Sequence, residues 1–136
     1  MSESHVPGHT TATVSRAVRD YTALTQVHNF AEEIEPLLAE ARANPSHRAA
    51  RTLSKDASLN AVLMAIAAGV EIQDHSAHGS AILQVLRGHA RVHLEEGEVD
   101  LRAGEAISLA GRVPHRLAAV EETALLLVVV AVPPRS

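Results

Sequence analysis

Residues 81–109 read AILQVLRGHARVHLEEGEVDLRAGEAISL and contain four short apolar segments separated by turn residues. Within residues 89–94, apolar and polar side chains alternate, which is the period of a strand with one buried face. Gly88, Gly97 and Gly104 stand between the segments, where the turns of antiparallel strands are expected. This part of the chain therefore predicts a series of consecutive short β-strands.

Strand patterns continue on both sides of this region. Residues 49–54 form a short strand pattern, and residues 59–67 are apolar on both faces, as in a buried strand. Residues 124–132 form a near-continuous apolar run that suits the middle of a sheet. Many short strands at even spacing predict an all-β fold, either a sandwich or a barrel.

A helical pattern precedes the strands. Asn29 suits the N-cap position, and Glu32 and Glu33 fall in the first turn, near the positive end of the helix dipole. The helical spacing forms one apolar stripe of Phe30, Ile34, Leu37, Leu38 and Ala41. Pro36 interrupts the pattern, so we expect a kink or two short helices, ending at Asn44. This segment should pack outside the strands or against a second subunit.

Composition excludes several classes of function. The net charge is −4, with one lysine among twelve basic residues, and only 1% of residues are aromatic, so no nucleic-acid partner is expected. The chain contains no cysteine, which excludes disulfides and thiolate metal sites. No signal peptide or membrane-length apolar run is evident, and we expect a cytoplasmic protein without a membrane partner.

The chain contains nine histidines, and they fall into three groups. His5, His9, His28 and His47 lie in or beside the N-terminal segment and are expected to be solvated polar residues. His89 and His93 share the polar face of residues 89–94 with Arg91, and we expect surface or subunit-interface positions for both.

The third group comprises His75, His78 and His115. The first two are three residues apart, just after a predicted strand, and the third follows forty residues on, before another strand. Two neighbouring imidazoles and one distant imidazole are a common way for a β scaffold to hold a transition metal. From the spacing alone, ordinary loop histidines are the more frequent explanation.

Two segments resemble the paired motifs of the cupin superfamily. Residues 69–88 are similar to the first motif, G-x5-H-x-H-x3,4-E-x6-G, with Gly69, His75 and Gly88 in place. Residues 104–115, GEAISLAGRVPH, are similar to the second motif, G-x5-P-x-G-x2-H. The resemblance covers residues 48–132 and implies a single cupin-type β-barrel, of the small RmlC-like kind, over residues 46–136. Residues 1–45 would form a partly helical extension.

The sequence departs from the motifs at the proposed ligands. His75 and His115 match directly, whereas the second histidine is His78, one place late, and position 77 is Ala77. Ala81 occupies the position of the acidic ligand. Gln84 lies on the same predicted strand, but alternation places it on the opposite face from position 81, which makes it a weak candidate ligand.

The resemblance implies a divalent transition metal (Zn, Fe, Mn, Ni or Cu) held by His75, His78 and His115, a small-molecule substrate or ligand, and a homodimer. A metal-dependent enzyme, either a dioxygenase or an isomerase, is one functional reading. The alternatives are a metal-free protein that binds a small ligand and a structural dimer with a degenerate site, both favoured by the missing acid. No catalytic acid or base is identified.

Overall fold

The computed structural model describes residues 25–55, 58–73 and 79–130. These residues form one helix and nine strands, in agreement with the predicted all-β fold and its short N-terminal helix. The elements in chain order are α1 (Phe30–Ala43), β1 (Arg48–Lys55), β2 (Leu59–Ile66), β3 (Glu71–Gln73), β4 (Ala81–Arg87), β5 (His89–Leu94), β6 (Gly97–Arg102), β7 (Ala106–Leu109), β8 (Arg116–Ala119) and β9 (Thr123–Val130).

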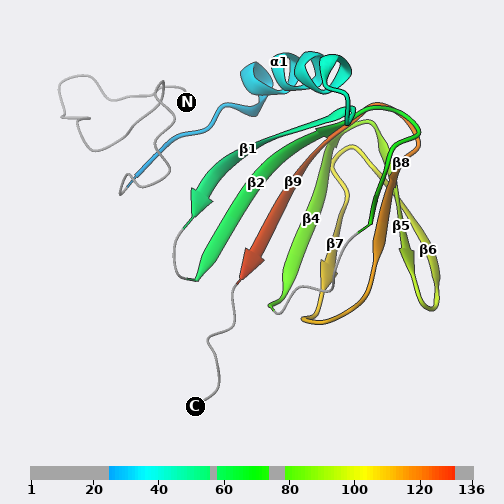
Figure 1. Cartoon of the computed structure of the whole chain (residues 1–136). Coiled ribbons are helices and arrows are strands. Elements are labelled where there is room, and N and C mark those ends of the chain that lie inside the picture. Colours follow the sequence, from blue (N-terminus) through cyan, green and yellow to red (C-terminus); the bar gives the residue numbers. More distant parts are fainter. Residues whose placement is uncertain (1–24, 56–57, 74–78, 131–136) are drawn as a thin grey trace.

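The strands form two antiparallel sheets that lie face to face (Figure 1). The five-stranded sheet has the order β1-β2-β9-β4-β7, and the four-stranded sheet has the order β3-β8-β5-β6. Between them lies a core to which both sheets contribute, with Leu83, Val85 and Leu125 from one sheet and Val92 and Leu117 from the other. This arrangement is the predicted barrel of the jelly-roll type.

Strand β9 explains the longest apolar run of the sequence. It lies in the centre of the five-stranded sheet, between β2 and β4, and both faces of its first half are covered. Leu125 faces the other sheet, whereas Ala124 and Leu126 face the helix. A central strand covered on both sides needs apolar residues at every position, so the two-residue alternation disappears.

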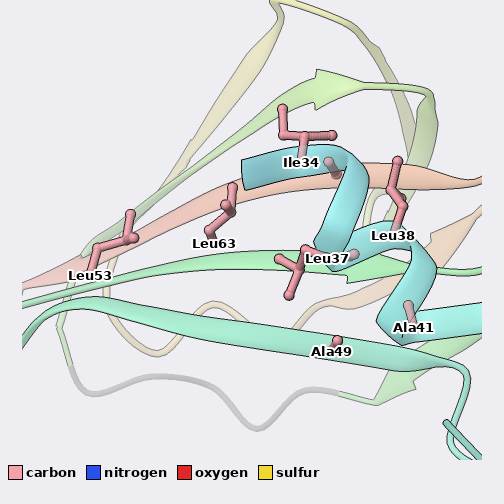
Figure 2. Close-up of a cluster of buried hydrophobic side chains, with 9 residues drawn as sticks. Ile34, Leu37, Leu38, Ala41, Ala49, Leu53 and Leu63 are labelled. Atoms are coloured by element: carbon pink, nitrogen blue, oxygen red, sulfur yellow. The ribbon is translucent and has the colours of Figure 1, made fainter. Parts of the chain in front are cut away.

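Helix α1 covers the outer face of the five-stranded sheet (Figures 1 and 2). Asn29 is the N-cap, and its side-chain oxygen accepts a hydrogen bond from the backbone N–H of Glu32 at 3.3 Å. The predicted stripe is confirmed: Ile34, Leu37, Leu38 and Ala41 are buried, and Phe30 packs beside them.

Of the two alternatives expected at Pro36, a kink or two short helices, the second is wrong, because α1 continues through Pro36 to Ala43. Proline removes one backbone hydrogen bond and disturbs the turn before it, at roughly 3 kcal/mol. Leu37 and Leu38, directly after the proline, are fully buried against the sheet. Full burial of a leucine side chain contributes about 1.5–3 kcal/mol, so these two contacts offset the loss.

Ion pairs join the helix to the ends of β4 and β9. Arg42 contacts both carboxylate oxygens of Glu122, at 2.5 and 2.9 Å, and Glu35 pairs with Arg87. The hydrogen bond from Arg42 holds the pKa of Glu122 below its ordinary value. Within the described residues, no helix is both long and apolar enough to cross a bilayer.

Candidate site at the open end of the barrel

The interior between the sheets is closed at one end and open at the other. At the closed end, Ile66, Val85, Ala90 and Leu125 have no exposed surface. Farther along the strands, residues on the same inward faces are only half-buried, and these include Asn60, Val62, Leu94, Leu127 and Val129. Because these side chains face the opposite sheet, their exposure shows that solvent enters the interior from this end, which we call the open end.

His115 lies at the open end. It directly precedes β8, and on that strand Leu117 and Ala119 are buried while Arg116 and Ala118 are half-buried. His115 lies just outside the strand, and if the alternation of β8 is extended by one residue it falls on the same side as the inward-facing Leu117. The sequence motif had predicted a strand beginning at this histidine, and the strand begins one residue later.

The hydrogen bonding of His115 fixes its tautomer. Its Nδ1 atom lies 3.0 Å from the backbone oxygen of Val113. A carbonyl oxygen only accepts hydrogen bonds, so Nδ1 carries the proton and donates it. Histidines that bind metals in proteins commonly make this contact, because it orients the ring and leaves Nε2 as the ligand atom.

The other two predicted ligands, His75 and His78, lie outside the described residues. The residues that flank them, Gln73 and Gly79, are described, and Gln73 is the register partner of Arg116, next to His115. Among the residues that are described, no group of three His, Cys, Asp or Glu side chains could hold a metal ion. The described part of the chain thus supplies one imidazole of the proposed set.

Ala81 and Gln84 lie on opposite faces of β4. Ala81 is buried, on the same face as Leu83 and Val85, and its side chain bears no donor atom. Gln84 faces the other way, and its side-chain nitrogen donates to the carbonyl of Gly104 at 3.3 Å. The prediction that Gln84 faces away from position 81 is therefore confirmed, and Ala81 itself supplies no acid.

The structure adds one polar residue that the sequence reasoning missed. Asn60 lies on β2 with the inward-facing Val62, Met64 and Ile66, and its register partner on β9 is Val129. Its side-chain oxygen is buried and has no hydrogen-bond partner among the residues that the structure describes. An unsatisfied buried oxygen costs about 1–3 kcal/mol, so its presence calls for an explanation. The available signal was the lone polar residue within the apolar segment LNAVLMAI.

His89 and His93 lie on the outer face of the four-stranded sheet, opposite to the interior. The prediction of a surface position is wrong for His89, which is only 6% exposed. Its Nε2 atom hydrogen-bonds Asp100 at 2.9 Å, while the hydroxyl of Thr123 contacts both its backbone N–H and its carbonyl. The hydrogen bonds from His89 and Arg91 hold the pKa of Asp100 below its ordinary value.

His93 lies nearer to the open end and is half-buried. Its Nδ1 atom is 2.9 Å from a carboxylate oxygen of Glu98. Both His93 and His115 border an open cavity of about 640 Å³ at the rim of the four-stranded sheet, which Gln73 and Arg116 also line. His93 reaches this cavity from the outer face of β5, and His115 borders it just before β8 begins.

Comparison with known proteins agrees with this architecture. The family model described as a cupin domain matches residues 62–131, which is just over half of the chain. No match was found among curated protein sequences.

Several solved structures are similar. A conserved protein of unknown function from Streptococcus pyogenes, SPY1581, has 30% identity, with 67% of this chain and 80% of that chain covered and a TM-score of 0.62. A cupin superfamily protein from Desulfitobacterium hafniense has 16% identity, coverage of 71% and 89%, and a TM-score of 0.64. A salicylate 1,2-dioxygenase from Pseudaminobacter salicylatoxidans has 20% identity, coverage of 72% and 33%, and a TM-score of 0.62. With both motifs, the two-sheet barrel and the family match in agreement, the chain belongs to the cupin domain family.

Proposed function

We propose that this cupin binds a divalent transition metal through His75, His78 and His115 and binds or converts a small molecule in the adjoining interior. The observation that carries the proposal is the position of His115. It lies directly before β8, two residues from the inward-facing Leu117, and its Nδ1 is held by the carbonyl of Val113. This is the orientation in which an imidazole serves as a ligand through Nε2.

The chain path supports the participation of His75. Gln73 pairs with Arg116 across two adjacent strands, and residue 75 is two residues farther along the chain. Two residues span at most about 7.6 Å between their Cα atoms. His75 is therefore tethered close to the strand that carries His115, and His78 follows within the same short connection between β3 and β4.

The absence of an acid at position 81 affects which ligand the site would prefer. Three neutral imidazoles leave the positive charge of a divalent ion uncompensated, whereas a site with a carboxylate would carry one positive charge fewer. The proposed site should therefore favour anions, such as a carboxylate or an enolate. A bound ion of this kind supplies Lewis-acid chemistry and lowers the pKa of bound water, as dioxygenases and isomerases require in different ways.

The metal content of untagged protein tests the proposal. We expect about one transition-metal ion per chain in the wild type and less than a tenth of that in His115→Ala, measured by elemental analysis. The matched control is His93→Ala, which removes an imidazole from the outer face of the same sheet and should leave the metal content unchanged. Equal loss in both variants, or full retention in His115→Ala, would contradict the proposed ligand set.

A metal-free binding protein is the second candidate, and the alanine at position 81 favours it. If untagged wild type contains no metal and takes up none from zinc, iron, manganese, nickel or copper salts, the hypothesis of a metal-free binding protein replaces that of a metal-binding protein. The apolar, partly exposed interior would then serve as the binding site without an ion.

We also propose that the protein is a homodimer. Leu59, Ile82 and Val130 are exposed on the outer face of the five-stranded sheet, beyond the part that α1 covers, at 38%, 50% and 46%. Leu59 and Val130 are register partners, so they form a continuous surface with Val128 and Ile82 on the next row. An apolar surface of this kind on a sheet is suited to contact with a second copy.

A further inference from the structure

We propose that Asn60 recognises a hydroxyl or amine group of the molecule that binds in the barrel interior. The inference deepens the proposed function, because it names a property of the ligand, but it does not depend on the metal. It rests on three features of Asn60: its direction, its unsatisfied oxygen and its place at the open end.

The direction of Asn60 follows from the register of two strand pairs. Asn60 pairs with Val129, and Val129 pairs in turn with Ala81 on β4. Directly paired residues point to the same face of a sheet. Since Ala81 lies on the same face as the core residues of β4, all three residues face the interior.

The second feature is chemical. Asn60 lies between Lys55 on β1 and Val129 on β9, and among the described residues its side-chain oxygen has no hydrogen-bond donor. Asparagine is also disfavoured in strands, so neither local preference nor packing accounts for it. A carbonyl oxygen accepts hydrogen bonds, which means that its missing partner is a donor, namely an O–H or N–H group.

The third feature is location. Asn60 as a whole is half-buried, and so are Val62 and Val129 next to it, which places the residue at the open end, although its side-chain oxygen is itself covered. His115 occupies the same end on the opposing sheet. Packed sheets lie roughly 10 Å apart, and side chains from both walls shorten that gap. A molecule that contacts both walls is therefore small, about one ring in size, with an apolar body and a hydrogen-bond donor.

Matched pairs of ring-sized probes test this inference. The pairs are 3-hydroxybenzoate with 3-methoxybenzoate and 4-hydroxybenzoate with 4-methoxybenzoate, titrated into the full chain by calorimetry. Within each pair the methoxy compound keeps the ring, the carboxylate and an oxygen, but lacks the donated hydrogen. In the wild type we expect at least one hydroxyl compound to bind roughly three- to tenfold more tightly than its partner, as a single hydrogen bond allows.

The variant Asn60→Val removes the amide and keeps a side chain that suits a strand. It should reduce the preference within each pair to less than twofold and should raise the melting temperature, because an unsatisfied buried oxygen is lost. Asn60→Asp retains an acceptor and should retain the preference. Lys55 is the register partner of Asn60 on β1, so Lys55→Met is the matched control, and it should keep the preference as well.

Three results would overturn the inference. The first is a hydroxyl preference that survives in Asn60→Val. The second is a marked fall in the melting temperature of that variant, which would reveal a structural role. The third is a wild type that binds neither hydroxyl compound more tightly than its methoxy partner. Metal content reports separately on the proposed function. A wild type without metal that still shows an Asn60-dependent preference would remove the metal proposal and leave this one standing.

Discussion

The two ends of the barrel are built from the same strands but differ in what their residues do. At the closed end the inward side chains are fully buried, and Gly88 takes the chain directly from β4 in one sheet to β5 in the other. At the open end most of the inward side chains are half-buried, although Ala81 is buried, and this end holds Asn60 and His115. The contrast indicates that stability is concentrated at the closed end, which leaves the open end to carry polar groups that contribute little to the fold.

The largest expected effect is at the closed end, with Gly88→Ala. A Cβ atom at residue 88 would lie 2.2 Å from the backbone oxygen of Glu122 and 2.9 Å from the Cα of Thr123, at a φ of +98°. Backbone atoms cannot yield as a flexible side chain does, so we expect a loss of about 4 kcal/mol or more, or no folded protein. Urea denaturation measures this loss.

Gly69→Ala is the control for this substitution. Its φ is +84°, but a Cβ atom there would meet nothing within 4 Å. Only the strain of the left-handed conformation remains, at about 1–2 kcal/mol. Similar losses at Gly69 and Gly88 would show that the closed end is not closely packed around Gly88.

A smaller loss of stability is expected from alanine substitutions at Leu125 and Leu127, and the two losses should differ. These residues lie two positions apart on the inward face of β9. Leu125 is fully buried toward the closed end, and Leu127 is half-buried toward the open end. We expect Leu125→Ala to lower the free energy of unfolding by about 3–5 kcal/mol, as for other fully buried leucines, and Leu127→Ala by at most half as much. Equal losses in chemical denaturation would mean that the interior is equally well packed at both ends.

The smallest effect on stability is expected on the outer surface beside the open end, with Ile82→Glu. Half of Ile82 is exposed, and surface substitutions usually change stability by less than about 0.5 kcal/mol. If two copies meet on this surface, the charge should convert a dimer into a monomer, which sedimentation equilibrium measures. A wild-type monomer, or a variant that remains dimeric, would remove this surface from the proposed dimer contact.

The sequence predicted the strands well, because alternation and glycine turns are local signals. The helix from Asn29 and the central position of β9 were also predicted correctly. The error at Pro36 arose because a local rule was applied without the burial of Leu37 and Leu38. That burial depends on β1, β2 and β9, whose assembly no local pattern describes.

The candidate site was predicted less completely. The motif proposed His115, and strand alternation correctly predicted that Gln84 faces away from position 81. The burial of His89 was missed because it results from Thr123 and Asp100, residues that are distant in the sequence. Asn60 was overlooked because its significance depends on which face of β2 is turned inward, and only the pairing of β2 with β9 settles that.

The order of strands in the five-stranded sheet also has a consequence for how the protein is made. Strand β9 lies between β2 and β4, so this sheet lacks its middle member until residues 123–130 have been synthesised. Until then β2 is paired only with β1, and the edges of β2 and β4 that β9 later occupies are both unpaired. Completion of the sheet should therefore follow translation of β9, and a nascent chain paused before residue 123 would be prone to aggregation and dependent on chaperones.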